Sequence, residues 1–207
     1  MLENLRFDER GLMPVIAQDW RTGEVRMLAW ANKEAIEKTL QTGYAHYYSR
    51  SRQRVWKKGE TSGELQRVLE VRIDCDNDTL IYIVQQEKNV ACHTGERNCF
   101  FRNIEGDRVK GVLPFETLPR LQELIAQRLE EKPEGSYTVK IASEGEDRVL
   151  QKFGEEAIEA LLALKKGDPK EIRAEVSDLL YFLVLSLTIK GVGVEEVLQE
   201  LSSRMKL

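Results

Sequence analysis

The pattern of apolar and polar residues changes near the middle of the chain. Up to about residue 103, short apolar or β-branched runs alternate with polar turns, which is typical of β-strands. One helix is expected among them, because Asn32 can cap its first turn and Gly43 can end it after Thr42. The expected strands are Pro14–Gln18, Val25–Trp30, Tyr44–Arg52, Leu65–Asp74 and Thr79–Val84.

Beyond residue 111, the apolar residues recur at helical spacing. The expected helices are Pro119–Glu131, Asp147–Lys166, Lys170–Lys190 and Val194–Lys206. A polar, glycine-containing stretch, Glu105–Gly111, separates the two patterns and is the expected linker. The sequence therefore predicts two domains, a strand-rich α+β domain over residues 1–110 and an all-α helical bundle over residues 111–207.

Composition narrows the class of protein. Hydrophobic residues make up 42% of the 207 positions, which is enough for packed cores and excludes a disordered chain. The net charge of −4 gives no overall attraction to nucleic acid or to an anionic membrane. The first residues lack the apolar core of a signal peptide, and the apolar run that starts at Leu179–Leu185 is too short to span a bilayer. We therefore expect a cytoplasmic protein with reduced thiols.

Three cysteines, Cys75, Cys92 and Cys99, are the first sign of metal chemistry. A structural zinc site usually has four protein ligands, whereas three suit an open catalytic site whose fourth position holds water. Zinc lowers the pKa of such a water to about 7. The alternative is three small thiols that pack as apolar groups. His93 follows Cys92 directly, and we expect it to transfer protons, although a lone histidine is more often a packing residue.

Asp74, Asp76 and Asp78 surround the first cysteine. If this segment is extended, the three carboxylates share one face, where they repel one another unless a cation such as Mg²⁺ lies among them. Cys75 would then point to the other face and would meet the other thiols across a chain reversal or a subunit boundary. A calcium-binding EF-hand loop begins with the same spacing of aspartates, but Thr79 stands where that loop needs glycine. The alternative is a solvated acidic turn.

Cations, hydroxyls and glycines gather between residues 48 and 63. Guanidinium groups, hydroxyls and backbone amides beside glycines together suit a phosphate. The residues expected to hold phosphate or ribose groups are Ser49, Arg50, Ser51, Arg52, Lys58, Thr61 and Ser62. A solvated basic strand and an RNA-binding patch are the alternatives, but the stretch is only one strand and one turn long, which favours a small phosphorylated ligand.

Acidic residues recur three positions apart on two consecutive expected helices. The pairs are Glu156 with Glu159 and Glu175 with Asp178, and each pair lies on one helix face. If the helices fold antiparallel about Gly167–Pro169, all four carboxylates come within about one turn of each other. Such a cup is similar to the metal sites of helical bundles, and solvated surface glutamates are the alternative.

These motifs together make the chain similar to a family of histidine biosynthesis, phosphoribosyl-AMP cyclohydrolase fused to phosphoribosyl-ATP pyrophosphatase. The N-terminal part resembles the cyclohydrolase in Ser49-Arg50-Ser51-Arg52, Trp56-x-Lys58-Gly59-Glu60-Thr61-Ser62-Gly63, Asp74-Cys75-Asp76-x-Asp78 and Cys92-His93-Thr94-Gly95 with Cys99. The C-terminal part resembles the pyrophosphatase, and more widely the all-helical nucleotide pyrophosphohydrolases, in Ser136-Tyr137-Thr138, Lys152-x-Gly154-Glu155-Glu156-Ala157-x-Glu159 and Glu175-x-x-Asp178-Leu179-Leu180-Tyr181. No motif position departs from the pattern.

The resemblance implies two consecutive hydrolyses. The C-terminal domain would release pyrophosphate from phosphoribosyl-ATP, and the N-terminal domain would open the adenine ring of phosphoribosyl-AMP between N1 and C6. The implied ligands are Glu156, Glu159, Glu175 and Asp178 for Mg²⁺, Asp74, Asp76 and Asp78 for a further Mg²⁺, and Cys75, Cys92 and Cys99 for Zn²⁺. The zinc ligands would be shared between the subunits of a homodimer. Lys152 would bind substrate, and His93 would move protons.

Two other functions fit the same residues. One is a helical pyrophosphatase fused to a zinc-bearing RNA-binding module, which salt-dependent RNA binding without ring opening would indicate. The other is a non-catalytic assembly protein in which zinc ties subunits together, which full zinc occupancy without a bound water would indicate. The resemblance favours small nucleotides as partners, with neither nucleic acid nor a membrane.

Overall fold

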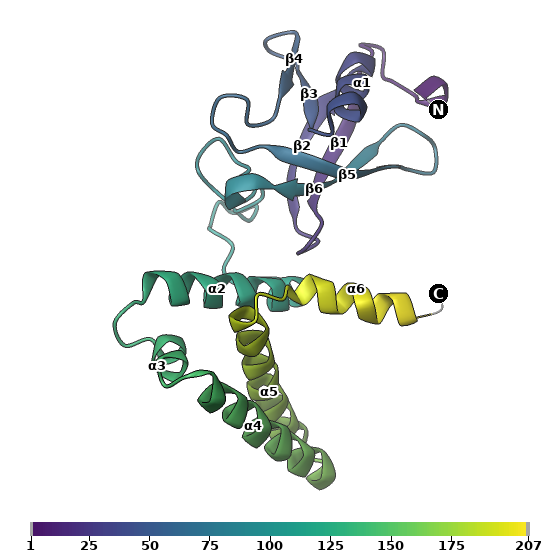
Figure 1. Cartoon of the computed structure of the whole chain (residues 1–207). Coiled ribbons are helices and arrows are strands. Elements are labelled where there is room, and N and C mark those ends of the chain that lie inside the picture. The colour runs from purple at the N-terminus through teal and green to yellow at the C-terminus, as the bar shows by residue number, and fades with distance from the viewer. Residues whose placement is uncertain (1, 206–207) are drawn as a thin grey trace. The chain divides into compact units, whose positions relative to one another are not determined.

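A computed structural model describes residues 2–205 and divides the chain into two compact units, Met1–Val112 and Leu113–Leu207 (Figure 1). The first is called the N-terminal unit and the second the C-terminal unit. The described elements of the N-terminal unit are η1 (Leu2–Asn4), β1 (Met13–Asp19), β2 (Val25–Ala31), α1 (Lys33–Thr42), β3 (His46–Ser49), β4 (Arg54–Lys57), β5 (Gln66–Ile73), β6 (Leu80–Gln86) and η2 (Glu87–Asn89).

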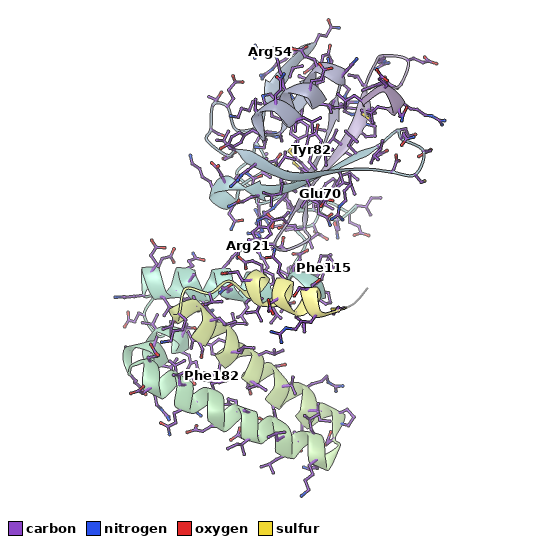
Figure 2. All side chains as sticks on the ribbon, turned by 45° about the vertical axis from the view of Figure 1, so that its right-hand side comes forward. Arg21, Arg54, Glu70, Tyr82, Phe115 and Phe182 are labelled. Carbon is purple, nitrogen blue, oxygen red and sulfur yellow. The ribbon has the colours of Figure 1, made fainter. Side chains whose placement is uncertain are left out.

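The strands of the N-terminal unit form one sheet in the order β4-β3-β2-β1-β6-β5. Neighbouring strands run antiparallel except β1 and β6, which are parallel. Side chains of β1 alternate in burial, and Met13, Val15 and Ala17 are fully buried, as expected for a strand with one face on the core. They pack with Ile36 of α1 and Tyr82 of β6, which Figure 2 labels inside this unit. The core therefore lies between the sheet and α1.

The β1–β2 pairing contains a β-bulge. Ala17 pairs with Met27 and Gln18 pairs with Val25, so Arg26 has no partner on β1. Arg26 and Met27 are both buried although they are adjacent in sequence, which a regular strand with a single core face does not allow. The bulge thus turns a charged side chain into the interior of the unit.

The C-terminal unit is helical. Its described elements are η3 (Pro114–Glu116), α2 (Thr117–Glu131), α3 (Tyr137–Ser143), α4 (Glu146–Lys166), α5 (Pro169–Ile189) and α6 (Val194–Arg204). Helices α4 and α5 pack side by side as a hairpin (Figure 1). The hairpin turns at Gly167, which has φ 80°, and the Asp168 side chain caps α5 by accepting a hydrogen bond from the Lys170 amide at 2.8 Å. The core centres on Ile125, Leu185 and Phe182, the last of which is labelled in Figure 2.

The predicted fold class, a strand-rich α+β part followed by an all-α part, is confirmed. Besides the 3₁₀ helices η1, η2 and η3, two short elements, β4 and α3, were not predicted. The expected strand Tyr44–Arg52 ends at Ser49, because the following turn contains Gln53 at φ 49° and leads into the separate strand β4. Helix α3 has seven residues, too few to show an apolar period, and begins at the N-cap Ser136. The last residue of the expected helix Val194–Lys206 lies outside the described residues.

Over residues 2–205, no single helix combines the length and apolar composition of a membrane span. The pair α5 and α6 meets that test only when taken together, and it is bent by 109°.

Candidate metal centres and nucleotide-binding residues

Two of the three cysteines lie together in one loop of the N-terminal unit. Cys92 and Cys99 are close enough for each thiol to alter the pKa of the other. Burial, together with the neighbouring Cys92, raises the pKa of Cys99 to about 11. Burial also acts to raise the pKa of Cys92, but hydrogen bonds to Thr94, whose Oγ1 lies 3.1 Å from Sγ, outweigh it and lower that pKa. The pair thus combines one thiol that ionises readily with one that holds its proton, and a soft cation would stabilise both as thiolates.

The thiol loop is tied to the β1–β2 hairpin by buried polar groups. The Cys99 amide donates to the carbonyl oxygen of Arg26 at 2.8 Å. Arg97 donates to Glu24 at 2.6 Å, and Asn98 donates to the same carboxylate. The Arg26 guanidinium donates to the carbonyl oxygen of Arg97 at 3.3 Å. Residues more than 70 positions apart are therefore held in register, which fixes the backbone that carries the two thiols.

The other residues expected near zinc lie in different places. Cys75 is exposed and follows the end of β5, and within residues 2–205 of one chain it does not form a three-ligand group with Cys92 and Cys99. His93 is exposed in the turn that the Gly95 amide closes on the Cys92 carbonyl oxygen. Lys58, expected to bind phosphate, is buried, pairs with Glu64 at 3.6 Å and acts electrostatically on Cys99. Lys58 is therefore near enough to the thiols for its charge to act on the pKa of Cys99.

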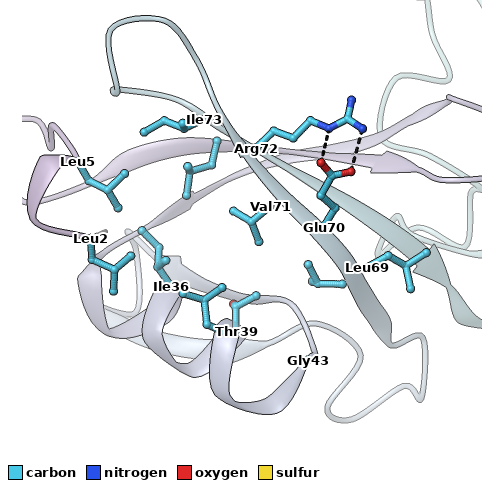
Figure 3. Close-up of a pocket in the computed structure, with 13 residues that line it drawn as sticks. Leu2, Leu5, Ile36, Thr39, Gly43, Leu69, Glu70, Val71, Arg72 and Ile73 are labelled. Atoms are coloured by element: carbon cyan, nitrogen blue, oxygen red, sulfur yellow. Dashed lines mark hydrogen bonds and ion pairs between the residues drawn. The ribbon is translucent and has the colours of Figure 1, made fainter. Parts of the chain in front are cut away.

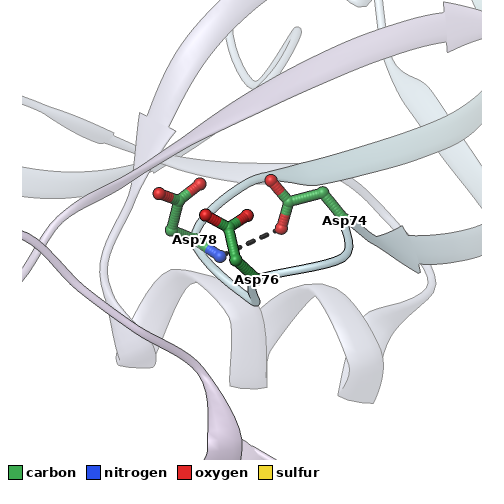
Figure 4. Close-up of side chains that lie close together, drawn as sticks. All are labelled: Asp74, Asp76 and Asp78. Atoms are coloured by element: carbon green, nitrogen blue, oxygen red, sulfur yellow. Dashed lines mark hydrogen bonds between the residues drawn. The ribbon is translucent and has the colours of Figure 1, made fainter.

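Asp74, Asp76 and Asp78 offer ligand oxygens that all lie within 4.8 Å of one another (Figure 4). The argument from the sequence held only if this segment is extended, and that condition is not met, because the segment forms a tight turn in which Asn77 has φ 67°. Oδ1 of Asp74 accepts hydrogen bonds from the amides of Asp78 at 3.0 Å and Thr79 at 3.1 Å. The carboxylates converge because the turn closes on itself, so strand parity gives no direction for the intervening cysteine.

The pKa of Asp74 is under two opposed influences. Burial acts to raise this pKa, but the hydrogen bonds from the Thr79 and Asp78 amides outweigh burial and lower it. The carboxylate is thus kept in the ionised form that a hard cation requires.

The hairpin of α4 and α5 brings acidic residues of both helices together, as the sequence predicted. Glu156, Glu175 and Asp178 offer ligand oxygens within 4.8 Å of one another, and Glu156 is buried. Glu159 is not part of that group of three, but its negative charge acts on the carboxyl group of Glu175. Burial and the negative charges of its neighbours, Glu159 first, raise the pKa of Glu175. The crowded carboxylates repel one another, and a cation among them would relieve that repulsion.

Lys152 lies beside these acids on α4. Its ammonium group pairs with Glu155 at 2.9 Å and with Glu156 at 3.5 Å. The hydrogen bond with Glu155 raises the pKa of Lys152. One cation thus lies next to the carboxylate cup, where a phosphate group would be expected.

The remaining basic and hydroxyl residues divide between two places. The segment Ser49–Arg52 lines a hollow of about 820 Å³, together with Arg10, Trp30 and other residues of β2 to β4. Thr61 and Ser62 are exposed in the separate turn that follows β4. Sequence reasoning missed Arg10 and Trp30, which also line the hollow; Trp30 comes near the basic segment through its pairing with Tyr48 across β2 and β3.

A strand-rich unit with paired thiols, followed by a helical unit with clustered carboxylates, is the arrangement of a two-domain nucleotide hydrolase. The family described as phosphoribosyl-AMP cyclohydrolase matches residues 27–101, and the family described as phosphoribosyl-ATP pyrophosphohydrolase matches residues 118–205. The chain belongs to the family of bifunctional histidine biosynthesis proteins called HisIE. The resemblance, the enzyme class and the two domain activities predicted from the sequence are thereby confirmed.

Three relatives illustrate this similarity. The "Histidine biosynthesis bifunctional protein HisIE" of Aquifex aeolicus is 63% identical over 202 residues, which cover 98% of each chain. The protein of the same name from Thermotoga maritima is 47% identical over 196 residues, covering 94% of this chain and 98% of the relative. The one from Thermus thermophilus is 47% identical over 204 residues, covering 98% and 93%. The similarity therefore runs through both units.

Proposed function

We propose that the two units carry out consecutive steps. The C-terminal unit hydrolyses phosphoribosyl-ATP to phosphoribosyl-AMP and pyrophosphate, and the N-terminal unit then opens the adenine ring of phosphoribosyl-AMP between N1 and C6. One observation carries this proposal: the carboxylate cup lies in the region that matches the pyrophosphohydrolase, and the thiol pair lies in the region that matches the cyclohydrolase. A cytoplasmic location stays a prediction from the sequence.

In the C-terminal unit, the carboxylate cup would hold Mg²⁺. The proposed ligands are Glu156, Glu175 and Asp178, whose oxygens converge, together with Glu159, whose charge acts on Glu175. Their crowding and the raised pKa of Glu175 support this assignment, since hard carboxylate oxygens are the ligands Mg²⁺ prefers. Mg²⁺, when bound, offsets the charge that develops on the phosphate groups. Lys152 would turn from the carboxylates towards the substrate phosphates, because its stem is flexible and its partner Glu155 is exposed to solvent at 38%.

In the N-terminal unit, Cys92 and Cys99 fit zinc, because they are neighbouring soft ligands whose thiol protons would be displaced on binding. Zinc, when bound with one position open to solvent, supplies a water of lowered pKa for attack on C6. His93 lies on the same loop and is exposed, so it can deliver the proton that N1 needs when the N1–C6 bond breaks. Lys58, beside Cys99, would offset negative charge at the reacting end of the substrate.

A further Mg²⁺ would be held by Asp74, Asp76 and Asp78. The support is the same as for the helical site: three carboxylates whose oxygens converge, one of them held ionised by two backbone amides. Because this turn contains Cys75, a cation bound there would also fix the backbone next to the third expected zinc ligand.

We further propose a homodimer in which Cys75 comes from the partner chain. β5 is an edge strand, and its apolar side chains Leu69 and Ile73 are exposed. They line a largely apolar hollow of about 340 Å³ between β5 and α1, which Figure 3 shows together with Leu2 and Leu5. A second copy covering this face would lie next to Cys75, which follows β5 by two residues. Within residues 2–205 of one chain, no third metal-ligating side chain joins Cys92 and Cys99, so a thiol from the partner would complete the set.

The C-terminal unit also has an apolar face suited to a second copy. Three side chains of α4, Ile158, Leu161 and Leu162, are exposed at 60 to 65%. Exposed leucines and isoleucines on one helix are typical of a surface that is covered in an assembly.

The test of separate sites uses two variants and a matched control. Cys92→Ala should abolish ring opening and leave pyrophosphate release intact, and Glu159→Gln should do the reverse. Glu200→Gln is the control for Glu159→Gln, because Glu200 is an exposed helical glutamate paired with a nearby arginine. Ring opening is followed by ultraviolet absorbance and pyrophosphate by a coupled assay. Equal loss of both activities in Cys92→Ala would contradict separate sites, and unchanged pyrophosphate release in Glu159→Gln would remove Glu159 from the cup.

The dimer is tested independently of activity. Sedimentation should give a dimer for the native chain and a smaller species for Leu69→Asp, and the bound zinc should fall in Cys75→Ala. A monomer that binds one zinc per chain would refute the shared site.

A further inference from the structure

Arg26 is a buried cation that the proposed function leaves without a role. It stands at the β-bulge of β2, and its side chain is 1% exposed. Oδ2 of Asp19 accepts hydrogen bonds from its Nε at 3.0 Å and from its Nη2 at 2.7 Å. A carboxylate oxygen of Glu24 lies 3.3 Å from its Nη1. Because all three guanidinium nitrogens have a carboxylate partner, the planar group is held in one orientation.

The same guanidinium group binds both ends of the thiol loop, which spans residues 89–99. Nη2 of Arg26 donates to Oδ1 of Asn89, the last residue of η2, at 3.1 Å. Nη1 donates to the carbonyl oxygen of Arg97 at 3.3 Å. The backbone of Arg26 adds a third contact, because its carbonyl oxygen accepts a hydrogen bond from the Cys99 amide at 2.8 Å. One residue of β2 therefore holds the first and the last turn of this loop.

The functional side chains lie between these attachments. Cys92 and His93 follow Asn89 by three and four residues, and Cys99 is the last residue of the loop. Within the loop, the Gly95 amide donates to the Cys92 carbonyl oxygen at 3.0 Å. Such bonds shape the turn from within, whereas the contacts with Arg26 attach the turn to the sheet.

Glu24 strengthens the attachment at the second end of the loop. This buried carboxylate accepts hydrogen bonds from Nε of Arg97 at 2.6 Å and from the Asn98 side chain. Since Glu24 also pairs with Arg26, one carboxylate connects the guanidinium group that holds the loop with the loop itself. Bonds between charged groups that are shielded from water are among the strongest polar contacts.

We propose that Arg26 is a positioning residue of the ring-opening site, which holds both ends of the thiol loop and so sets the separation of Cys92 and Cys99 before a metal binds. A tetrahedral zinc site requires sulfur ligands at a fixed separation, because each lies about 2.3 Å from the ion. A loop that is already held at that separation loses less entropy on binding. The inference rests on the proposed ring-opening function and deepens it by naming what orders the metal site.

Asn89 offers the sharpest variant, because replacing Arg26 itself would leave the buried Asp19 without its cation. Asn89 is exposed and has φ 55°, a conformation that glycine adopts without strain. Asn89→Gly removes the oxygen that binds Nη2, whereas Asn89→Asp keeps an oxygen there. The matched control is Lys88→Gly, because Lys88 is exposed, has φ 56° and precedes the loop. It adds the same backbone freedom one residue away and leaves the contact of Asn89 in place.

The zinc affinity of the full chain, measured by competition with a chromogenic chelator, is the first readout. Asn89→Gly should weaken zinc binding by about tenfold or more, as is typical when a partner behind the metal ligands is lost. Asn89→Asp and Lys88→Gly should bind zinc within about threefold of the native chain. Glu24→Gln should weaken binding as Asn89→Gly does, and it decides the test alone if Asn89→Gly does not fold. Native zinc affinity in Asn89→Gly, or equal weakening in Lys88→Gly, would overturn the proposal.

The separation of the thiols can also be tested without metal. In a zinc-free chain that carries Cys75→Ala, a reagent that fluoresces only when it bridges two thiols should link Cys92 to Cys99. The bridging rate, divided by the rate of single-thiol modification, should fall by about threefold or more in Asn89→Gly. It should stay native in Asn89→Asp and in Lys88→Gly. An equal or higher ratio in Asn89→Gly would overturn the proposal.

Ring-opening kinetics separate failure of this inference from failure of the function. Asn89→Gly should lower kcat and leave KM for phosphoribosyl-AMP near the native value, because the loop carries His93 and the metal ligands. If the native chain opens the ring while Asn89→Gly keeps the native zinc affinity and bridging ratio, the positioning role is wrong and the function stands. If the native chain does not open the ring, the function fails, and the bridging ratio still decides whether Arg26 sets the separation of the thiols.

Discussion

Replacement of Arg26 by methionine should destabilise the N-terminal unit strongly. The Arg26 side chain is 1% exposed and donates to Oδ2 of Asp19 from Nε at 3.0 Å and from Nη2 at 2.7 Å. It also pairs with Glu24 at 3.3 Å and donates to Asn89 at 3.1 Å. Methionine matches the length of the stem and removes the charge. Asp19 would then be a buried carboxylate without a cation.

The size of the effect follows from burial. Removing one partner of a buried ion pair typically costs about 3–5 kcal/mol, because the other charge is left uncompensated. Glu24 keeps its bonds to Arg97 and Asn98, so the loss concentrates on Asp19. Hydrogen bonds from Thr22 and the Arg21 amide, all at 3.1 Å, remain and place the expected loss at the lower end of that range.

The pH dependence has a definite sign. Burial acts to raise the pKa of Asp19, but the charge and hydrogen bonds of Arg26 outweigh it and lower that pKa. A carboxylate whose pKa is lowered in the folded state adds stability above its unfolded pKa of about 3.9 and loses it as the pH falls. The stability difference between the native chain and Arg26→Met should therefore be present near neutral pH and shrink as the pH falls below about 4, through the lowered pKa of Asp19.

Urea unfolding followed by tryptophan fluorescence measures the effect, since all tryptophans belong to the N-terminal unit. A chelator keeps both proteins free of zinc, so that metal release does not add to the difference. The control is Lys38→Met, which removes an exposed pair with Glu34 on α1 and should cost less than about 1 kcal/mol. The double variant with Asp19→Asn should recover part of the loss.

A loss below about 1 kcal/mol for Arg26→Met, or strict additivity of the Arg26 and Asp19 changes, would refute the reasoning. Either result would mean that water or another group replaces the guanidinium without cost.

Three further predictions concern local structure. Gly59→Ala should cost more than about 2 kcal/mol by fluorescence-monitored unfolding, because its φ is +76° and the new Cβ would lie 2.3 Å from the backbone of Glu64. Gly11→Ala, at φ +71° with nothing within 4 Å, should cost only about 1 kcal/mol. Leu185→Ala should cost about 2–5 kcal/mol by far-ultraviolet circular dichroism, because this fully buried side chain fills the helical core. Asp168→Ala should cost about 1 kcal/mol by the same method, because it removes the cap of α5. A result outside these ranges, or a Gly11→Ala loss equal to that of Gly59→Ala, would contradict the stated cause.

Local sequence signals were sufficient to predict a site where its residues are brought together by a single turn of the chain. The carboxylate cup was predicted because Gly167–Pro169 specifies a tight turn and helical spacing then sets which acids face each other. The aspartate trio was predicted to converge, but for the wrong reason: a turn closed by backbone amides, and not an extended strand, brings it together. The hollow was only partly predicted, because Trp30 joins it through strand pairing that no local pattern encodes.

The thiol loop shows why long-range placement escapes local reasoning. Its position depends on Arg26, and a regular strand pattern would turn at most one of Arg26 and Met27 into the core. The bulge places Arg26 among carboxylates from the hairpin and frees its carbonyl oxygen for Cys99. A bulge of this kind leaves no signature in composition or periodicity, because the sequence pattern alone predicts a regular hairpin. The carboxylate cup of α4 and α5 therefore follows from the sequence almost residue by residue. The thiol site depends instead on the bulge between β1 and β2 and, in the proposed dimer, on the surface of β5 that a second chain would cover.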